Sequence, residues 1–131
     1  GVSIDALREA HGSPLFVYSE RAIRRRHQEF TDAFAIRYPK VRHAWSYKTN
    51  YLRAICSLFH RLGSWAEVVS AMEYEMARSL GVAPGKIVFN GPHKSYDAIL
   101  RAVKEGAILN LDGFDELVDV ERHVPDRQNP V

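Results

Sequence analysis

The sequence predicts an α/β fold built on a parallel β-sheet. Short apolar segments typical of strands alternate with amphipathic segments of helical period between residues 43 and 120. The strand segments end near residues 48, 69, 89 and 111, at intervals of about 20 to 22 residues. Such regular alternation is typical of βα units, whose strands run parallel. Parallel strands of this kind either close into an eight-stranded barrel or form an open, doubly wound sheet.

One strand and one helix are predicted before these units. Residues 15–19 (LFVYS) are apolar and aromatic and follow a Gly-Ser-Pro turn signal, which indicates a strand. Ser19 suits the N-cap of a helix, and Pro39 ends that helix. The side chains that recur at helical spacing between them are Ile23, His27, Phe30, Phe34 and Tyr38.

The first βα unit covers about residues 43–63. Residues 43–48 (HAWSYK) are predicted to form its strand, Asn50 to cap its helix and Gly63 to end that helix. Side chains alternate between the two faces of a strand. The bulky face consists of His43, Trp45 and Tyr47, and the small face of Ala44, Ser46 and Lys48. The bulky face suits packing against the helices, so the small face is expected to point inward, with Lys48 at its mouth.

A carboxylate interrupts the second strand. Residues 65–69 (WAEVV) form this predicted strand, and Glu67 lies between apolar neighbours. A buried carboxylate needs a partner, and Lys48 on the neighbouring strand is the natural candidate. The alternative to a functional pair is an ordinary lysine–carboxylate pair near a strand end. Ser70 and Glu73 then form the capping-box pattern S-x-x-E, which opens the next helix.

The third and fourth units follow the same plan. Strands are predicted over residues 86–89 and 108–111, Ser95 begins the third helix, and Asp112 caps the fourth. Residues 124–131 (VPDRQNPV) are predicted to form a polar loop. Four units are half of a barrel, and an open parallel edge would remain unpaired. We therefore expect a fragment, or a protomer that completes its sheet with another chain.

Composition excludes several classes of protein. The 46% hydrophobic and 26% charged content is ordinary for a soluble globular chain, and no apolar run approaches the ~20 residues that span a bilayer. The N-terminus has no signal-peptide core. A single cysteine, Cys56, excludes an internal disulfide and favours a reducing, cytoplasmic compartment. Residues 21–26 are arginine-rich, but we interpret them as a solvated helix face and expect no nucleic-acid partner.

Polar residues follow the predicted strands at the edge where parallel folds carry their chemistry. They are Lys48, Ser70, Asn90 and Asp112. Helix capping explains Ser70 and Asp112, whereas lysine does not cap an N-terminus. A lysine beside apolar walls loses its charge readily and can form a Schiff base with a carbonyl, the alternative being a solvated lysine at a strand end. His93, on the third βα loop, is either a substrate contact or simply exposed. No metal site is predicted.

Five segments match, in order and spacing, the motifs of a known family. Residues 13–18 (SPLFVY) resemble TPLYVY, residues 47–50 (YKTN) resemble YAxKAN, and residues 67–73 (EVVSAME) resemble DVVSGGE. Residues 87–95 (IVFNGPHKS) and 110–117 (NLDGFDEL) are similar to IVFHGNNKS and NVDSxxEL. Together they resemble the fold-type III decarboxylases that depend on pyridoxal 5'-phosphate (PLP), which include the diaminopimelate, ornithine and arginine decarboxylases and share a barrel with alanine racemase.

This resemblance implies a (β/α)8 TIM-type barrel, of which the chain supplies roughly the first four βα units plus an N-terminal strand and helix. Residues 1–131 are then the N-terminal part of an alanine-racemase-like, PLP-binding barrel domain, without the rest of the barrel and the C-terminal β-domain. The resemblance also implies PLP as cofactor, with Lys48 forming the internal aldimine. Glu67 and Ser70 are further cofactor-side candidates. The substrate-side candidates are His93, Asn90 and Asp112.

The implied activity is PLP-dependent decarboxylation of an amino acid, similar to that of diaminopimelate decarboxylase. The resemblance further implies a cytoplasmic homodimer that acts on a small amino-acid substrate. The chain by itself is expected to be inactive, because barrels commonly hold phosphate with loops after the seventh and eighth strands. Two alternatives stay open: a non-catalytic relative that serves as a binding or regulatory protein, and a racemase-type PLP enzyme. The presence of Lys48 argues against the first.

Overall fold

Four parallel strands form the centre of the computed structural model, which describes residues 2–123. The strands are β1 (Ala44–Ser46), β2 (Trp65–Val68), β3 (Ile87–Phe89) and β4 (Ile108–Leu109). They pair in the order β1-β2-β3-β4, and each neighbouring pair is parallel. A doubly wound sheet reverses its strand order, whereas a barrel does not, so this order is that of a barrel. The loop expected over residues 124–131 lies outside the described residues.

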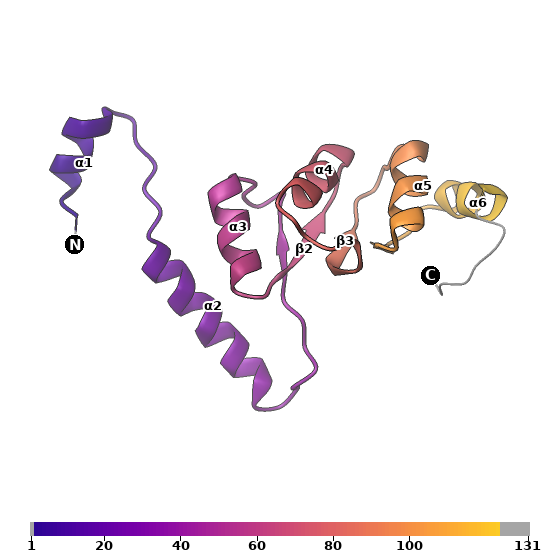
Figure 1. The fold of residues 1–131 in the computed structure, drawn as a ribbon, viewed down its shortest axis with the longest axis horizontal. Coiled ribbons are helices and arrows are strands. Elements are labelled where there is room, and N and C mark those ends of the chain that lie inside the picture. The colour runs from indigo at the N-terminus through magenta and orange to yellow at the C-terminus, as the bar shows by residue number, and fades with distance from the viewer. Residues whose placement is uncertain (1, 124–131) are drawn as a thin grey trace.

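Helices follow the strands and cover one face of the sheet. They are α3 (Arg53–Arg61), α4 (Ala71–Ser79), α5 (Tyr96–Glu105) and α6 (Phe114–His123), and a short 3-10 helix, η1 (Pro84–Lys86), leads into β3. Figure 1 shows α3, α4, α5 and α6 following one another across the molecule in chain order. None of the helices between residues 2 and 123 has the length and apolar character needed to cross a bilayer.

The core lies between the sheet and these helices. Most side chains on the helix side are completely buried; these are Tyr47, Ala66, Val68, Ile87 and Phe89. Trp45 stacks on Phe59 of α3 with 3.8 Å between ring centroids, which confirms that the bulky face of the first strand packs against the helices. The other face is only partly buried. Ser46, Glu67 and Val88 are register partners on it and lie side by side.

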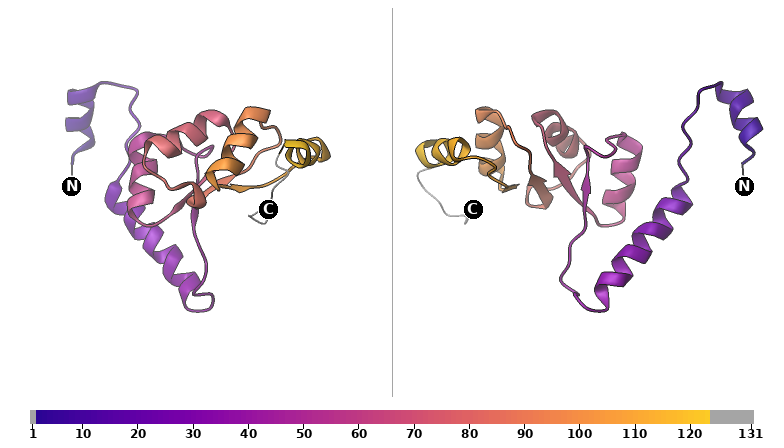
Figure 2. Two further views of the ribbon diagram at one scale, coloured as in Figure 1. Left: turned by 45° about the vertical axis from the view of Figure 1, so that its right-hand side comes forward. Right: turned by 180° about the vertical axis from the view of Figure 1, so that it is seen from behind.

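The N-terminal region differs from the sequence prediction in two ways. Residues 15–19 form no strand: they are extended and exposed, and no strand that the structure describes pairs with them. A helix that was not predicted, α1 (Ile4–His11), precedes them. Its first turn holds the acidic Asp5 and its last turn the basic His11, the arrangement that the helix dipole favours. In Figures 1 and 2, α1 lies well apart from the sheet.

The helix predicted after Ser19 is present as α2 (Glu20–Ala35). The Ala22 N–H donates to Ser19 Oγ at 3.3 Å, which confirms Ser19 as the N-cap. The helix ends at Ala35, so Pro39 is not what stops it. Its C-terminal end leads into the loop before β1, as Figure 1 shows.

Several boundaries also differ. Each strand ends one or two residues before its predicted end, except β3, which ends at Phe89 as expected. Asn50 is not the N-cap of α3, because Leu52 holds that position and its N–H donates to Asn50 Oδ1 at 3.0 Å. The helix α6 begins at Phe114, so Asp112 does not directly precede it as a cap would.

Candidate active site

The C-terminal ends of the four strands lie at one edge of the sheet because the strands are parallel. The predicted site residues Lys48, Ser70, Asn90 and Asp112 follow β1, β2, β3 and β4 in turn. His93 lies on the loop between β3 and α5, at the same edge. The structure therefore places all of these residues on the side of the sheet that the sequence predicted.

Lys48 is exposed in the turn after β1 and forms no ion pair within residues 2–123. The residue before it, Tyr47, is fully buried, and its hydroxyl lies 2.7 Å from His60 Nε2. His60 Nδ1 lies 3.0 Å from the Ser64 carbonyl oxygen, which can only accept, so Nδ1 carries the proton and Nε2 accepts from Tyr47. Burial raises the pKa of Tyr47 and lowers the pKa of His60, so both groups stay neutral. This arrangement anchors the chain directly after β1.

Glu67 lies on the open face of the sheet, away from the helices. Its Oε1 accepts a hydrogen bond from Asn90 Nδ2 at 3.3 Å. The sequence predicted Lys48 as the partner of Glu67, but no ion pair joins the two in the part of the chain that the structure describes. Asn90 instead pairs with this carboxylate, because it follows Val88, the register partner of Glu67, by two residues on the same face.

Ser70 is the N-cap of α4, as the capping-box pattern predicted. The Glu73 N–H donates to Ser70 Oγ at 3.2 Å, and Glu73 Oε2 accepts from the Val69 N–H at 2.8 Å. The carboxylate thus reaches one residue further back than in the usual box. Since Ser70 Oγ acts as acceptor in the cap, its hydroxyl proton remains able to donate to a ligand.

Gly91 brings the loop after β3 close to the loop after β2. Its φ is +107°, and a Cβ at this position would lie 2.8 Å from the Val69 carbonyl oxygen. Any other residue would therefore suffer both a strained backbone and a collision. Glycine here lets the main chains of two site loops approach each other.

A buried ion pair at this edge escaped the sequence analysis. Lys94 Nζ lies 2.9 Å from Glu116 Oε2, and the two side chains are 0% and 6% exposed. The signal was present, because the fourth matched segment shares Lys94 with its family motif and the fifth shares Glu116. A charged residue on a loop and one in the first turn of a helix are both ordinarily solvated, so neither position indicated burial.

The side chains of His93 and Asp112 are exposed at the same edge. The Asp112 main-chain N–H donates to Glu116 Oε2 at 3.0 Å. Among the predicted site residues, Glu67 and Asn90 are connected by a side-chain hydrogen bond. Within residues 2–123 it shows no hydrogen bond or ion pair from Lys48 to any of the others.

Comparison with known proteins shows which family has this fold and this site. Residues 20–131 match the family described as "Pyridoxal-dependent decarboxylase, pyridoxal binding domain". The chain therefore belongs to the pyridoxal-dependent decarboxylase family, whose cofactor is pyridoxal phosphate. Its four βα units are the first units of the TIM-type barrel of that family.

Individual relatives are diaminopimelate decarboxylases. The chain is 31% identical over 118 residues to the enzyme of Aquifex aeolicus, and the aligned residues cover 89% of this chain and 27% of that relative. It is 36% identical over 118 residues to that of Halalkalibacterium halodurans, with the same coverage of each. The crystal structure of diaminopimelate decarboxylase from M. jannaschii in complex with L-lysine superposes with a TM-score of 0.81 at 32% identity, over 89% of this chain and 28% of that one. The chain thus spans under a third of the length of these relatives.

The residues at the strand ends fit pyridoxal phosphate chemically. A carbonyl-bearing cofactor needs a primary amine that is not held by a carboxylate, and Lys48 provides one. A cofactor whose ring nitrogen becomes positively charged on protonation also suits a carboxylate on the barrel-facing side of the sheet, where Glu67 lies. Lys48 and Glu67 therefore supply the two groups that this cofactor needs from the chain, an unpaired amine and a carboxylate.

Proposed function

We propose that this chain provides the lysine-bearing part of a PLP-dependent amino-acid decarboxylase, a carboxy-lyase of the diaminopimelate decarboxylase type. The observation that carries the proposal is the amine of Lys48: it follows β1 of a pyridoxal-binding barrel, and no acidic side chain in residues 2–123 engages it. Lys48 Nζ is then the atom that attaches covalently to the cofactor. Residues 1–131 would form the N-terminal part of the barrel domain.

The other residues of the edge have separate roles in this proposal. Glu67, oriented by Asn90, presents an anionic oxygen to the barrel-facing side and stabilises positive charge near the cofactor. Ser70 donates its hydroxyl proton to a cofactor oxygen while its Oγ caps α4. His93 and Asp112, both exposed, are the substrate-side groups: an imidazole suits a carboxylate, and an aspartate suits an ammonium group.

The chemistry divides between the cofactor and this chain. When bound, pyridoxal phosphate supplies an electron sink for the electron pair that remains when carbon dioxide leaves. Lys48 Nζ would hold the cofactor and would give up that place to the substrate α-amine. The freed amine, once protonated, could donate a proton to the substrate carbon that has lost carbon dioxide. The anchoring of Tyr47 to His60 keeps the main chain before Lys48 fixed while the lysine side chain moves.

The substrate class rests on the relatives. They are diaminopimelate decarboxylases, so we propose a small amino acid with a second polar end group, and diaminopimelate is the first substrate to test. We also propose a homodimer in the cytoplasm. A buried, unpaired Cys56 suits that compartment.

Borohydride reduction tests the assignment of Lys48. The full-length polypeptide that contains these residues is incubated with PLP, reduced and digested, and the pyridoxyl group is located by mass spectrometry. Wild type is expected to carry the label on Lys48, Lys48→Ala to carry none, and Lys86→Ala to label like wild type. Lys86 is the matched control because it is exposed but precedes β3, at the opposite edge of the sheet. Label on Lys48→Ala in wild-type amounts would refute the assignment.

Product analysis then tests the reaction. Carbon dioxide release from meso-diaminopimelate or another amino acid, measured with wild type and with Lys48→Ala, is expected only for wild type. Formation of the mirror-image amino acid without carbon dioxide release would instead identify a racemase. Labelling of Lys48 without turnover of any amino acid would identify a non-catalytic binding protein.

A further inference from the structure

We infer that Lys94 and Glu116 are positioning residues for the substrate side of this site. Their buried ion pair holds the loops after β3 and β4 in one fixed arrangement, and these loops carry His93 and Asp112. The inference rests on the proposed function and extends it, because it assigns a role to two residues that do not themselves reach the exposed edge.

One carboxylate connects both loops. Glu116 Oε1 accepts from the main-chain N–H of Lys94 at 3.2 Å. Glu116 Oε2 accepts from the main-chain N–H of Asp112 at 3.0 Å and pairs with Lys94 Nζ at 2.9 Å. Glu116 lies in the first turn of α6, so the helix fixes the position of the carboxylate. The main chains at Lys94 and at Asp112 are therefore set relative to each other through a single group.

Lys94 closes its own loop over the two residues that separate it from Gly91. Its Nζ donates to the Gly91 carbonyl oxygen at 2.6 Å, and its side chain is completely buried. Gly91 is in turn packed against Val69 of the preceding loop. His93 thus lies between two fixed points of the main chain, and its exposed side chain starts from a defined position.

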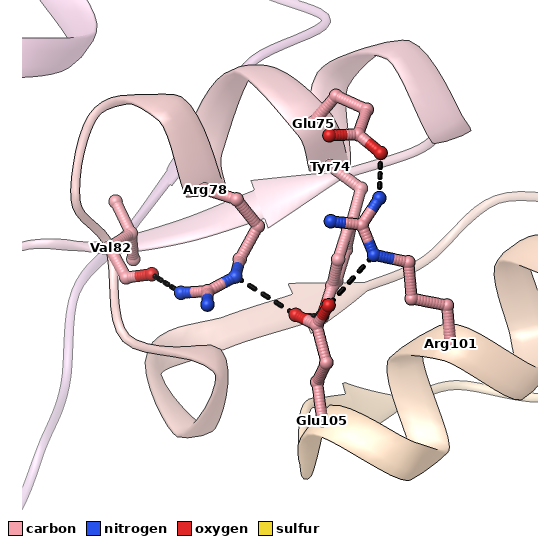
Figure 3. Close-up of polar contacts among 6 residues, drawn as sticks. All are labelled: Tyr74, Glu75, Arg78, Val82, Arg101 and Glu105. Carbon is pink, nitrogen blue, oxygen red and sulfur yellow. Dashed lines mark hydrogen bonds and ion pairs between the residues drawn. The ribbon is translucent and has the colours of Figure 1, made fainter.

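The contacts distinguish this ion pair from one that only strengthens helix packing. On the outer side of the helices, Glu105 of α5 pairs with Arg78 of α4, as Figure 3 shows, through side chains that are 25% and 33% exposed. Glu116 instead bonds to the main chain of two loops. Apolar residues of similar volume commonly replace a buried ion pair with no loss of stability, so stability alone is a weak reason for one. Fixing the geometry of the loops is the role that these contacts support.

Three variants of the full-length polypeptide test the inference. Glu116→Gln and Lys94→Met each remove one charge, and Lys94→Met/Glu116→Leu removes both. Each is expected to raise the KM for the amino-acid substrate about tenfold or more, since displacing a positioned group has effects of this order. Covalent PLP at Lys48 is expected to remain stoichiometric, because Tyr47 and His60 anchor that residue separately.

The double variant separates positioning from stability. The single variants leave one buried charge unpaired and are expected to melt at lower temperature. The double variant leaves no unpaired charge and is expected to recover part of the melting temperature, the rest being lost because the main-chain N–H groups of residues 94 and 112 no longer have the Glu116 oxygens as acceptors. Its KM is expected to stay raised. Recovery of the melting temperature and the KM together would show a merely structural pair and overturn the inference. If a single variant does not fold, the double variant still provides this comparison.

Hydrogen exchange gives a readout that needs no substrate. In Glu116→Gln the amides of Lys94 and Asp112 are expected to exchange about tenfold faster or more, while the Val69 amide, held by Glu73, keeps its rate. Unchanged exchange at Lys94 and Asp112 would overturn the inference whatever the activity. A wild type that fixes these amides but decarboxylates no amino acid would instead refute the proposed function. Glu105→Gln is the matched control, expected to lower the melting temperature without changing the KM or these amides.

Discussion

Removing one oxygen atom from Tyr47 tests how the structure holds the strand end next to Lys48. Tyr47→Phe keeps the buried ring in the core and deletes only the hydroxyl, which lies 2.7 Å from His60 Nε2. His60 cannot compensate by changing tautomer, because its Nδ1 proton is engaged with the Ser64 carbonyl oxygen at 3.0 Å. The substitution therefore leaves an acceptor nitrogen without its donor.

The cost of this change follows from burial. An unsatisfied buried acceptor costs about 1–3 kcal/mol, and water reaches the half-buried His60 ring in part, so we expect a loss of about 1–2 kcal/mol in the free energy of unfolding. Tyr74→Phe is the matched control. Its hydroxyl donates to Glu105 at 3.0 Å, but that carboxylate keeps both Arg78 and Arg101, as Figure 3 shows. We therefore expect Tyr74→Phe to cost less, below about 1 kcal/mol.

Urea unfolding of the two variants near neutral pH measures both values, and equal slopes against denaturant show that the unfolded states are comparable. We also expect Tyr47→Phe to lower the fraction of Lys48 that borohydride fixes to PLP, whereas Tyr74→Phe leaves that fraction unchanged. The reasoning is refuted if Tyr47→Phe costs no more than Tyr74→Phe. It is equally refuted if Tyr47→Phe is destabilised as expected but attaches PLP like wild type, since the anchor would then have no effect on Lys48.

Three further predictions concern stability. Burial lowers the pKa of His27 and His43 in the folded protein below 6.5. Between the folded and unfolded pKa values the unfolded chain therefore binds more protons than the folded one, so the free energy of unfolding, measured with urea, should fall as the pH drops below about 6.5. Ser70→Ala removes the N-cap of α4 and should cost about 1 kcal/mol in the same assay, with Ser70→Gly costing less. Gly91→Ala should lower the melting temperature more than Gly63→Ala, because both have positive φ but only Gly91 has a main-chain oxygen 2.8 Å from the added carbon.

Local patterns were sufficient to predict the parallel sheet and the edge that carries the site. The strand periodicity, the serine caps and the helix-ending glycines depend on a few neighbouring residues each, and the structure confirms Ser19 and Ser70 as caps. The strand predicted over residues 15–19 failed for a physical reason. Consecutive apolar and aromatic residues favour an extended backbone, which is present, but a strand also requires a hydrogen-bonded neighbour, and local composition does not supply one.

The buried ion pair of Lys94 and Glu116 could not be predicted from local sequence patterns. The two residues are 22 positions apart, and each by itself is an ordinary surface residue by composition. Only the packing of α6 against α5 and the turn at Gly91 bring the carboxylate beneath the loop. The sequence offered both residues as parts of matched motifs without showing that they belong together.

The exchange of partners at Glu67 depends on where two strands end. Lys48 follows Ser46 by two residues and Asn90 follows Val88 by two residues, and Ser46 and Val88 are the two register partners of Glu67. In a fully extended sheet the lysine and the asparagine would be equivalent neighbours of the carboxylate. The chain extends the ladder beyond β3, where the Asn90 N–H donates to the Val68 carbonyl oxygen at 2.7 Å.

Beyond β1 the ladder continues only to Tyr47, whose N–H donates to the Glu67 carbonyl oxygen at 3.0 Å, and the chain then turns. The Thr49 N–H donates to the Ser46 carbonyl oxygen at 3.2 Å, which takes Lys48 out of the ladder. Asn90 thus donates to Glu67, whereas no ion pair joins Lys48 to Glu67 within residues 2–123, although the spacing along the sequence is the same. A lysine paired with Glu67 would have to break that ion pair before its amine could attack a carbonyl. The turn at Thr49 removes this requirement, which agrees with the role proposed above for the Lys48 amine.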